Sequence, residues 1–249
     1  MIASLAMYQH PQLVDTHNRY WALIRAGLAE VGIDAPGRLS QDAEEFSVWN
    51  DPALVLAHTC GMPYRLWLHD HVYLVGTPDF GVDGCAAGYN RSALVVRQDD
   101  ERDSLLAYKD AVFAYNQTYS QSGYAAAYWH TEPLGFWFGR RIHTGGHLES
   151  ARAIAERRAD LAALDAVSWR IMQTHEPFVE NLRVLEWTSP TPGLPYIASA
   201  GADSEALFSV VSRAIDDLSN EDRAALGITG LVRLPKDDYL AVPSPPDAI

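Results

Sequence analysis

The sequence predicts an α/β protein whose sheets are largely parallel. Short apolar segments typical of buried strands alternate with amphipathic helices, most regularly from about residue 104 onward. Hydrophobic residues make up 48% of the 249 positions, which is enough for a large core. No internal repeat stands out, and no apolar run has the length that a membrane-spanning helix needs. We therefore expect one large domain or two lobes of moderate size.

The first hundred residues mix the two kinds of element. A short strand is expected at IASLAMY, and then a helix that begins near Pro11 and that Gly32 ends. A second helix is expected at NDPALVLAHTCG, because Asn50, Asp51 and Pro52 form a strong start signal. Strands are expected at RLWLHDHVYLVG, which alternates, and at SALVVRQ, which is rich in β-branched residues.

From residue 104 the expected elements alternate regularly. Helices are expected at SLLAYKD, after Ser122, at HLESARAIAERRAD, at AVSWRIMQTHEPFVENL and from Ser204 to Leu218. A last short helix is expected at SNEDRAALG, with Ser219 as its cap. Strands are expected at AVFAYN, LAALD, RVLEWT, LPYIAS, LVRLP and DYLAV, and the tail PSPPDAI is expected to be disordered.

The net charge limits the partners that the protein can have. Lys and Arg number 19 against 32 Asp and Glu, a formal net charge of −13. Such a field repels nucleic acid and anionic membranes, and no basic stripe opposes it, so we expect no nucleic-acid partner and no membrane insertion. A small anionic ligand stays compatible, because local dipoles in a closed cleft can outweigh a screened net charge.

Motifs for metals and cofactors are absent from the sequence. The pairs His69/His71 and His143/His147 have metal-ligand spacing, but a zinc site needs a third ligand and no Cys/His pair accompanies them. There is no Walker loop, GxSxG motif or GxGxxG motif. We therefore expect no metal and no cofactor.

The two cysteines, Cys60 and Cys85, match no zinc or redox spacing. Two buried thiols are compatible with the sequence, and so is a disulfide in an oxidising compartment. Cys60 could also be a nucleophile with a histidine elsewhere as its base, although nothing near it in the sequence activates the thiol.

Polar residues follow several of the expected strands, where α/β proteins bind ligands. The stretches Ser120–Gly123 and Thr144–His147 are both glycine-containing helix starts, and Asp165 ends the strand LAALD. Exposed N–H groups and the helix dipole would let the two helix starts hold a tetrahedral or carboxylate anion. Two ordinary capped helix starts are the alternative interpretation. Tyr8 and Trp49 are candidates for the apolar walls of such a pocket.

The stretch AYNQTYSQSGYAA, followed by TGGHLESARAIAERRADLAALDAVSW, resembles the phosphate/phosphite/phosphonate-type solute-binding proteins of ABC transporters. In that family an Asn-containing strand end leads to an S-x-S-G helix start. A TG(S/G)H block that ends in A-A-(L/I)-D then follows, and the match covers its length and order. The segments MYQHPQ and HTCGMPYR fit the family more loosely.

The resemblance implies a type II periplasmic-binding-protein fold, in which two lobes with mainly parallel sheets flank a ligand cleft. Lobe 1 would combine residues 1–90 with 190–249, and lobe 2 would span 93–185. The chain would cross between the lobes near 89–95 and 184–196.

The resemblance also implies ligand contacts. The donors to an anion would be Ser120, Gln121, Ser122 and Gly123. Thr144 and His147 would supply further donors, and Asp165 would orient the ligand or meet its amine. The opposite lobe would contribute Tyr8 and the turn of Thr59 and Cys60. No residue is expected to be catalytic.

These patterns favour a solute-binding protein of an ABC-type transporter, which closes over a small anionic or zwitterionic ligand. We expect the protein to be a monomer and a transporter permease to be its partner. A small-molecule enzyme that uses Cys60 or His147, or an intracellular ligand-sensing module, is the alternative. Family resemblance places the protein in the periplasm. The first residues do not read as a secretory signal, so a cytoplasmic location stays open as an alternative, as does a trimmed mature form.

Overall fold

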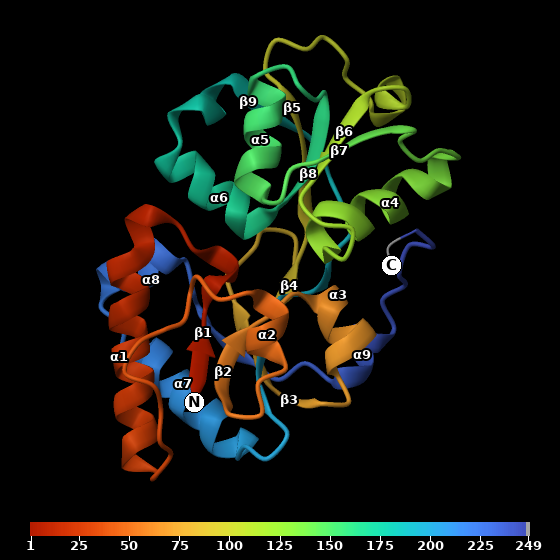
Figure 1. Ribbon diagram of the computed structural model, residues 1–249. Coiled ribbons are helices and arrows are strands. Elements are labelled where there is room, and N and C mark those ends of the chain that lie inside the picture. The colour runs from red at the N-terminus through yellow and green to blue at the C-terminus, as the bar shows by residue number, and fades with distance from the viewer. Residues whose placement is uncertain (248–249) are drawn as a thin grey trace. The chain divides into compact units, whose positions relative to one another are not determined.

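The computed structural model describes residues 1–247, and its chain divides into two compact units (Figure 1). Unit 1 consists of Met1–Tyr89 and Pro192–Ala241, and unit 2 consists of Asn90–Thr191 and Val242–Ile249. The segments where the chain passes from one unit to the other pair as a two-stranded sheet of β4 (Tyr89–Asn90) and β10 (Thr191–Pro192). Each unit is built around its own five-stranded sheet.

Unit 1 has the strand order β1-β2-β11-β3-β12. Its strands are β1 (Ile2–Ser4), β2 (Leu54–His58), β3 (Val72–Asp79), β11 (Tyr196–Ser199) and β12 (Gly230–Val232). Its helices are α1 (Val14–Glu30), α2 (Glu45–Trp49), α3 (Gly61–Pro63), α7 (Ser204–Asp216), α8 (Asn220–Leu226) and α9 (Lys236–Leu240), with a π-helical turn at Tyr64–Leu68 and 3-10 turns at Ala6–Tyr8 and Pro11–Leu13.

The two faces of this sheet carry separate apolar layers. Leu56 and Ala198 pack with α1 and α7 on one face, and Ala57 and Ile197 pack with α2 and α9 on the other. Successive residues of a strand point to opposite faces, so neighbours in β2 and in β11 serve different layers. Burial on both faces explains why all five residues of β2 are buried.

Unit 2 has the strand order β7-β6-β8-β5-β9. Its strands are β5 (Ser92–Arg97), β6 (Val112–Tyr115), β7 (Arg140–His143), β8 (Leu161–Asp165) and β9 (Leu182–Trp187). Its helices are α4 (Ala126–Thr131), α5 (His147–Ala155) and α6 (Ala166–His175), with a π-helical turn at Gln121–Ala125 and 3-10 turns at Leu105–Tyr108, Glu132–Leu134 and Pro177–Asn181. Figure 1 shows α5 and α6 on one side of this sheet and α4 on the other.

Both sheets are mixed rather than mainly parallel. β5 pairs antiparallel with β8 and β9, while β6 pairs parallel with β7 and β8. In unit 1, β11 pairs antiparallel with β2 and β3. A strand that runs parallel to its neighbour is usually connected to it through a helix. The chain enters β5 and β11 directly from the other unit, without such a helix, and both strands pair antiparallel with their neighbours.

Three expected elements are wrong. Residues 54–58 form a strand rather than a helix, because Asp51 closes a turn: its carboxylate accepts from the Ala53 N–H at 2.7 Å. The stretch RLWLHDH contains a π-helical turn, and the strand β3 begins only at Val72. The first three residues of DYLAV, Asp238–Leu240, lie in α9 and form no strand, and the buried Tyr239 has its hydroxyl 2.6 Å from Thr77 Oγ1.

The tail differs from expectation as well. The segment from Val242 on groups with unit 2, whereas the expected ranges place all of 190–249 in one lobe. Trp129 Nε1 donates to the Pro243 carbonyl at 3.1 Å, and Tyr124 and Arg141 bind the Asp247 carboxylate at 2.9 and 2.7 Å. The tail is therefore ordered as far as Asp247, and residues 248–249 lie outside the described part of the chain.

Candidate functional site

The helix start at Ser120 is built as an N-cap. Ser120 has an extended backbone, and its Oγ accepts from the Gly123 N–H at 3.0 Å. The helix then opens with a π-helical turn, in which the Ala125 N–H donates to the Ser120 carbonyl at 3.0 Å, and continues as α4. Because the first N–H groups of a helix have no intrahelical partner, this turn presents donors that a single serine cap cannot satisfy.

A second helix start meets the first one. α5 begins at His147, and its N-cap, Gly146, provides no side-chain hydrogen bond. Ser122 Oγ lies 3.0 Å from His147 Nε2, so the first residues of the two helices are in direct contact. Each helix adds about half a positive charge at its N-terminus, and the two contributions coincide here.

Asn116, at the end of β6, completes this contact. Its Nδ2 lies 3.5 Å from His147 Nε2, and its buried Oδ1 has no hydrogen-bond partner among residues 1–247. A Cβ atom at Gly123 would lie 1.9 Å from Asn116 Oδ1 and 3.2 Å from His147 Cε1. Only glycine therefore allows the helix to approach Asn116 this closely.

The His147 ring is neutral at physiological pH. Burial disfavours the charged imidazolium and lowers the pKa of His147 from 6.5 to about 4. The ring therefore serves as a hydrogen-bonding group rather than as a cation.

Thr144 stabilises the turn between β7 and α5. Its Oγ1 lies 3.0 Å from the Tyr115 carbonyl and 2.7 Å from Ser150 Oγ. Its N–H donates to the Tyr115 carbonyl at 2.9 Å, which fixes the entry of the chain into α5.

Asp165 is buried at the start of α6. It is 1% exposed, and its Oδ1 accepts from the N–H groups of Val167 and Ser168 at 2.8 and 3.2 Å. Its Oδ2 accepts from Asn90 Nδ2 at 2.7 Å. In this structure both oxygens of the carboxylate bind the protein itself.

Ser92 connects Asp165 to the first helix start. Ser92 stands opposite Asp165 in the β5–β8 ladder, and its Oγ donates to the Ser122 carbonyl at 2.9 Å. The expected site residues of unit 2 are therefore brought together in one cluster. The side chains of Ser120, Gln121 and Ser122 are all less than a tenth exposed within it.

The four expected residues of unit 1 have different surroundings. The Tyr8 ring packs edge-on against His58 and Phe80, with centroids 5.3 and 4.9 Å apart. Thr59 is fully buried, and its hydroxyl has no hydrogen-bond partner among residues 1–247. Cys60 is half-buried at the start of α3, and within the described chain no disulfide joins it to Cys85.

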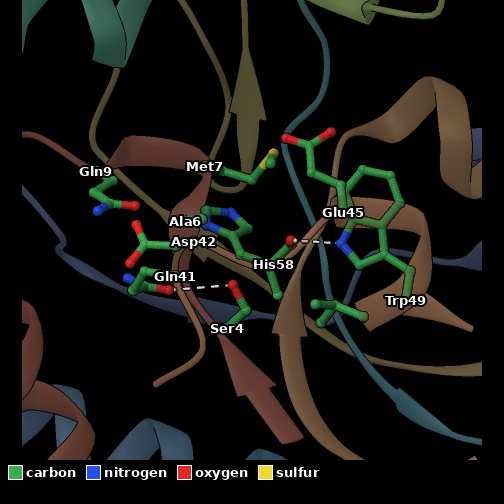
Figure 2. A pocket seen from close by; sticks show the side chains of 11 residues that line it. Ser4, Ala6, Met7, Gln9, Gln41, Asp42, Glu45, Trp49 and His58 are labelled. Carbon is green, nitrogen blue, oxygen red and sulfur yellow. Dashed lines mark hydrogen bonds between the residues drawn. The ribbon is translucent and has the colours of Figure 1, made fainter. Parts of the chain in front are cut away.

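Trp49 lies beside a pocket of unit 1, which Figure 2 shows. Its Nε1 donates to the His58 carbonyl at 3.1 Å, and Figure 2 marks this hydrogen bond. The pocket opens beside the residues that follow β1 and beside His58, the last residue of β2, and its volume is about 270 Å³.

Several contacting residues escaped the sequence-based prediction. In unit 2 these are Asn90, Ser92 and Asn116. In unit 1 they are His58, Asp42 and Glu45, which line the same pocket. Asn116 could have been found, because it is a polar residue directly after a buried strand. Asn90 and Ser92 carried no such signal, because Asn90 lies in the two-residue strand β4 and Ser92 is the first residue of β5, so neither follows a buried strand.

The first histidine of the HDH stretch, His69, belongs to an ion-pair cluster. His69 Nδ1 lies 2.8 Å from the Asp70 carboxylate, which also accepts from Lys236 at 3.0 Å. Within residues 1–247 no three His, Cys, Asp or Glu side chains come together as metal ligands. Over the same residues no helix has the length and apolar character to cross a bilayer.

The chain matches one family model over residues 56–239, and that model describes the ABC transporter, phosphonate, periplasmic substrate-binding protein. This match covers most of both units. No curated protein matches the chain.

Solved structures with the same fold cover nearly the whole chain. PhnD1 from Prochlorococcus marinus, in complex with methylphosphonate, has a TM-score of 0.70 at 15% identity, covering 96% of this chain and 94% of that one. XAC2383 from Xanthomonas citri, bound to ATP, has a TM-score of 0.69 at 17% identity, covering 95% and 91%. A binding-protein component of an ABC phosphonate transporter from Pseudomonas aeruginosa (PA3383) has a TM-score of 0.65 at 15% identity, covering 96% and 82%. The expected type II periplasmic-binding-protein fold is confirmed.

Proposed function

Because the chain belongs to the family of phosphonate-type periplasmic substrate-binding proteins of ABC transporters, we propose that its two meeting helix starts hold a phosphonate- or phosphate-like group. The solute-binding role follows from the family. The ligand, the residues that hold it and the absence of catalysis are our proposal.

The contact between Ser122 and His147 is the main support for the ligand class. It brings the positive ends of two helix dipoles to one point, together with hydroxyl and backbone donors. A tetrahedral anion has several oxygens and can accept from more than one of these donors at once. The chain's net charge of −13 does not oppose this, because the dipoles act at contact distance and the net charge is screened.

The roles expected for individual residues divide into two kinds. Ser122, Gly123 and His147 are proposed to face the ligand. Ser120 and Thr144 are proposed to shape the helix starts, since their hydroxyls already bind neighbouring backbone. Gln121 is also proposed to lie beside the ligand. The contributions of Tyr8, Trp49, Thr59 and Cys60 stay predictions.

Asp165 has a revised role in this proposal. Its carboxylate caps α6 and accepts a hydrogen bond from Asn90. In this proposal Asp165 therefore stabilises the site and does not contact a ligand amine. The permease partner is proposed from the family, and the monomeric state remains a prediction from the sequence.

Isothermal calorimetry tests the proposal with phosphate, phosphite and methylphosphonate. At least one should bind with a dissociation constant below about 1 mM, which corresponds to about 4 kcal/mol. Ser122→Ala should weaken that binding about tenfold through one lost charge-assisted hydrogen bond. Ser189→Ala, an exposed serine of unit 2, should not. If no member of the panel binds, the assignment of ligand class is wrong.

The absence of catalysis has its own test. The 31P spectrum of the bound ligand should stay unchanged over a day with the wild-type protein. Turnover that disappears in Cys60→Ser while binding persists would establish the enzyme alternative instead.

A further inference from the structure

The tail segment Val242–Asp247 follows α9 of unit 1 in sequence but groups with unit 2. Side chains of unit 2 bind it at Pro243 and at Asp247. Trp129 Nε1, in α4, donates to the Pro243 carbonyl at 3.1 Å, and Figure 1 shows the tail beside this helix. Three of the six tail residues are prolines, whose restricted backbone loses little conformational entropy on docking. The tail can therefore dock through few contacts.

Asp247 contacts two separate elements of unit 2. Its Oδ2 accepts from the Tyr124 hydroxyl at 2.9 Å and from Arg141 Nη1 at 2.7 Å, and Arg141 Nη1 also donates to the Tyr124 hydroxyl at 3.0 Å. Burial raises the pKa of Tyr124 to about 12, so the phenol keeps the proton that it donates. Burial works against ionisation of Asp247, but the hydrogen bonds from Arg141 and Tyr124 outweigh it and lower the pKa of its carboxyl. The carboxylate is therefore ionised where it joins the two elements.

These two elements carry the two helix starts of the candidate site. Tyr124 lies in the π-helical turn that opens the first helix, two positions after Ser122. Arg141 lies in β7, the strand that precedes α5, six positions before His147. The tail residue Asp247 thus binds both elements whose ends meet in the hydrogen bond between Ser122 and His147.

The Tyr124 ring extends this connection to the turn before α5. It packs edge-on against Tyr115, the last residue of β6, with ring centroids 5.2 Å apart. The Tyr115 carbonyl accepts from the Thr144 N–H at 2.9 Å, directly before α5. A contact that holds Tyr124 in place therefore also supports the entry of the chain into α5.

We infer that the tail is a strap that positions the two helix starts, with Asp247 as the positioning residue, and that tail docking and anion binding favour one another. Asp247 acts through Tyr124 and Arg141 and does not contact the ligand. By linkage, the factor that the docked tail adds to anion affinity equals the factor that the anion adds to docking. The effect on anion affinity rests on the proposed function, whereas the effect on the helix starts does not.

Calorimetry with methylphosphonate tests the effect on affinity. Asp247→Asn removes the partner charge of Arg141, and the affinity should fall about three- to tenfold, a moderate loss because the two side chains are 41% and 32% exposed. Removal of a negative charge alone would instead raise the affinity for an anion, so the direction of the change is diagnostic. Asp247→Glu keeps the charge and should recover most of the affinity. Asp110→Asn, the same charge change at an exposed position of unit 2, should bind no more weakly than the wild type.

Hydrogen exchange of the ligand-free protein tests the strap without any ligand. The Ala125 and Ser150 N–H groups donate to the Ser120 and Gly146 carbonyls and so close the first turns of the two helices. In Asp247→Asn both should exchange at least about threefold faster than in the wild type, because local opening becomes easier. The amides of β9, at the opposite edge of the sheet from β7, should keep their rates. A loss of global stability would raise the rates in all of these elements.

Trp129→Phe tests the other anchor of the tail. This change removes the donor to the Pro243 carbonyl and keeps an aromatic ring. If the tail docks as one unit, the double variant with Asp247→Asn should bind methylphosphonate no more weakly than the weaker of the two single variants. Additive losses would overturn docking as a single strap.

The two measurements separate this inference from the proposed function. If methylphosphonate binds but Asp247→Asn and Asp110→Asn have the same affinity, the strap is wrong and the proposed function stands. If phosphate, phosphite and methylphosphonate all fail to bind the wild type, the proposed function is wrong. Faster exchange at the two helix starts in Asp247→Asn alone would then still support the strap. Unchanged exchange there, or an increase that β9 shares, overturns the strap whether or not an anion binds.

Discussion

Ser122 Oγ lies 3.0 Å from His147 Nε2, although 25 positions separate the two residues in the chain. This hydrogen bond joins the start of the helix after β6 to the start of α5. β6 pairs parallel with both β7 and β8, so the strand ends that lead into these helices share one edge of the sheet. The contact is therefore a consequence of topology, and it places two helix dipoles at one point.

Gly123→Ala is expected to damage the site more than the fold. The new Cβ would lie 1.9 Å from Asn116 Oδ1, so Asn116 must move and its contact with His147 is lost. We expect a loss of stability of about 1–3 kcal/mol from overpacking. Affinity for the anion should fall at least about tenfold, in line with a displaced donor. Urea unfolding and calorimetry measure the two effects.

Gly139→Ala is the matched control for this substitution. A Cβ at Gly139 meets nothing within 4 Å and its backbone is not left-handed, so both measurements should stay at the wild-type values. Equal affinities for the two alanine variants would contradict the role given to Gly123.

Asp165→Asn is expected to lower the free energy of unfolding by about 1–3 kcal/mol through an unsatisfied buried group. The new amide would face Asn90 Nδ2, and Asn90 cannot turn round freely because its Oδ1 accepts from the Arg91 N–H at 2.8 Å. Asp203→Asn is the control, since Asp203 caps α7 in the same way at an exposed position. Chemical denaturation should show little change for the control. A similar loss in both variants would mean that only the cap matters.

The protein is expected to lose stability as the pH falls below 6.5. The pKa of His147 is lowered from 6.5 to about 4 in the folded protein, and that of His58 is lowered to about 3. Between these values and pH 6.5 the unfolded chain binds more protons, so acid favours unfolding; above pH 6.5 the contribution is fully present. Lowerings of this size correspond to about 3–5 kcal/mol at most for one ring.

His147→Gln separates one ring from the other. Its free energy of unfolding should fall less steeply between pH 6.5 and 5 than that of the wild type, measured by urea titration at each pH. Parallel pH profiles for the two proteins would show that His147 titrates normally in the folded state.

The alternation of strands and helices in unit 2 was predictable because its signals are local. LAALD and AVFAYN are short apolar runs between amphipathic helices, and they form β8 and β6. The helix starts at Ser120 and His147 followed from glycine and hydroxyl residues at strand ends. These features need no knowledge of the partner strand.

The errors arose where tertiary context overrides a local signal. Pro52 after Asp51 is a good helix start, but Leu54–His58 are buried on both faces and form the second strand of a sheet. The acceptors around Glu45 were missed for a related reason. Glu45 and His58 are 13 positions apart, and only the packing of α2 beside β2 brings them to one pocket.

The position of the bound anion is the most direct test of the central claim. Amide resonances of the 15N-labelled protein can be followed while methylphosphonate is added. We predict saturable shifts at the N–H groups of Ser122 and Gly123 and at the first residues of α5, with one dissociation constant for all of them. Saturable binding that leaves these amides unshifted while others move would contradict the claim that the two helix starts hold the ligand.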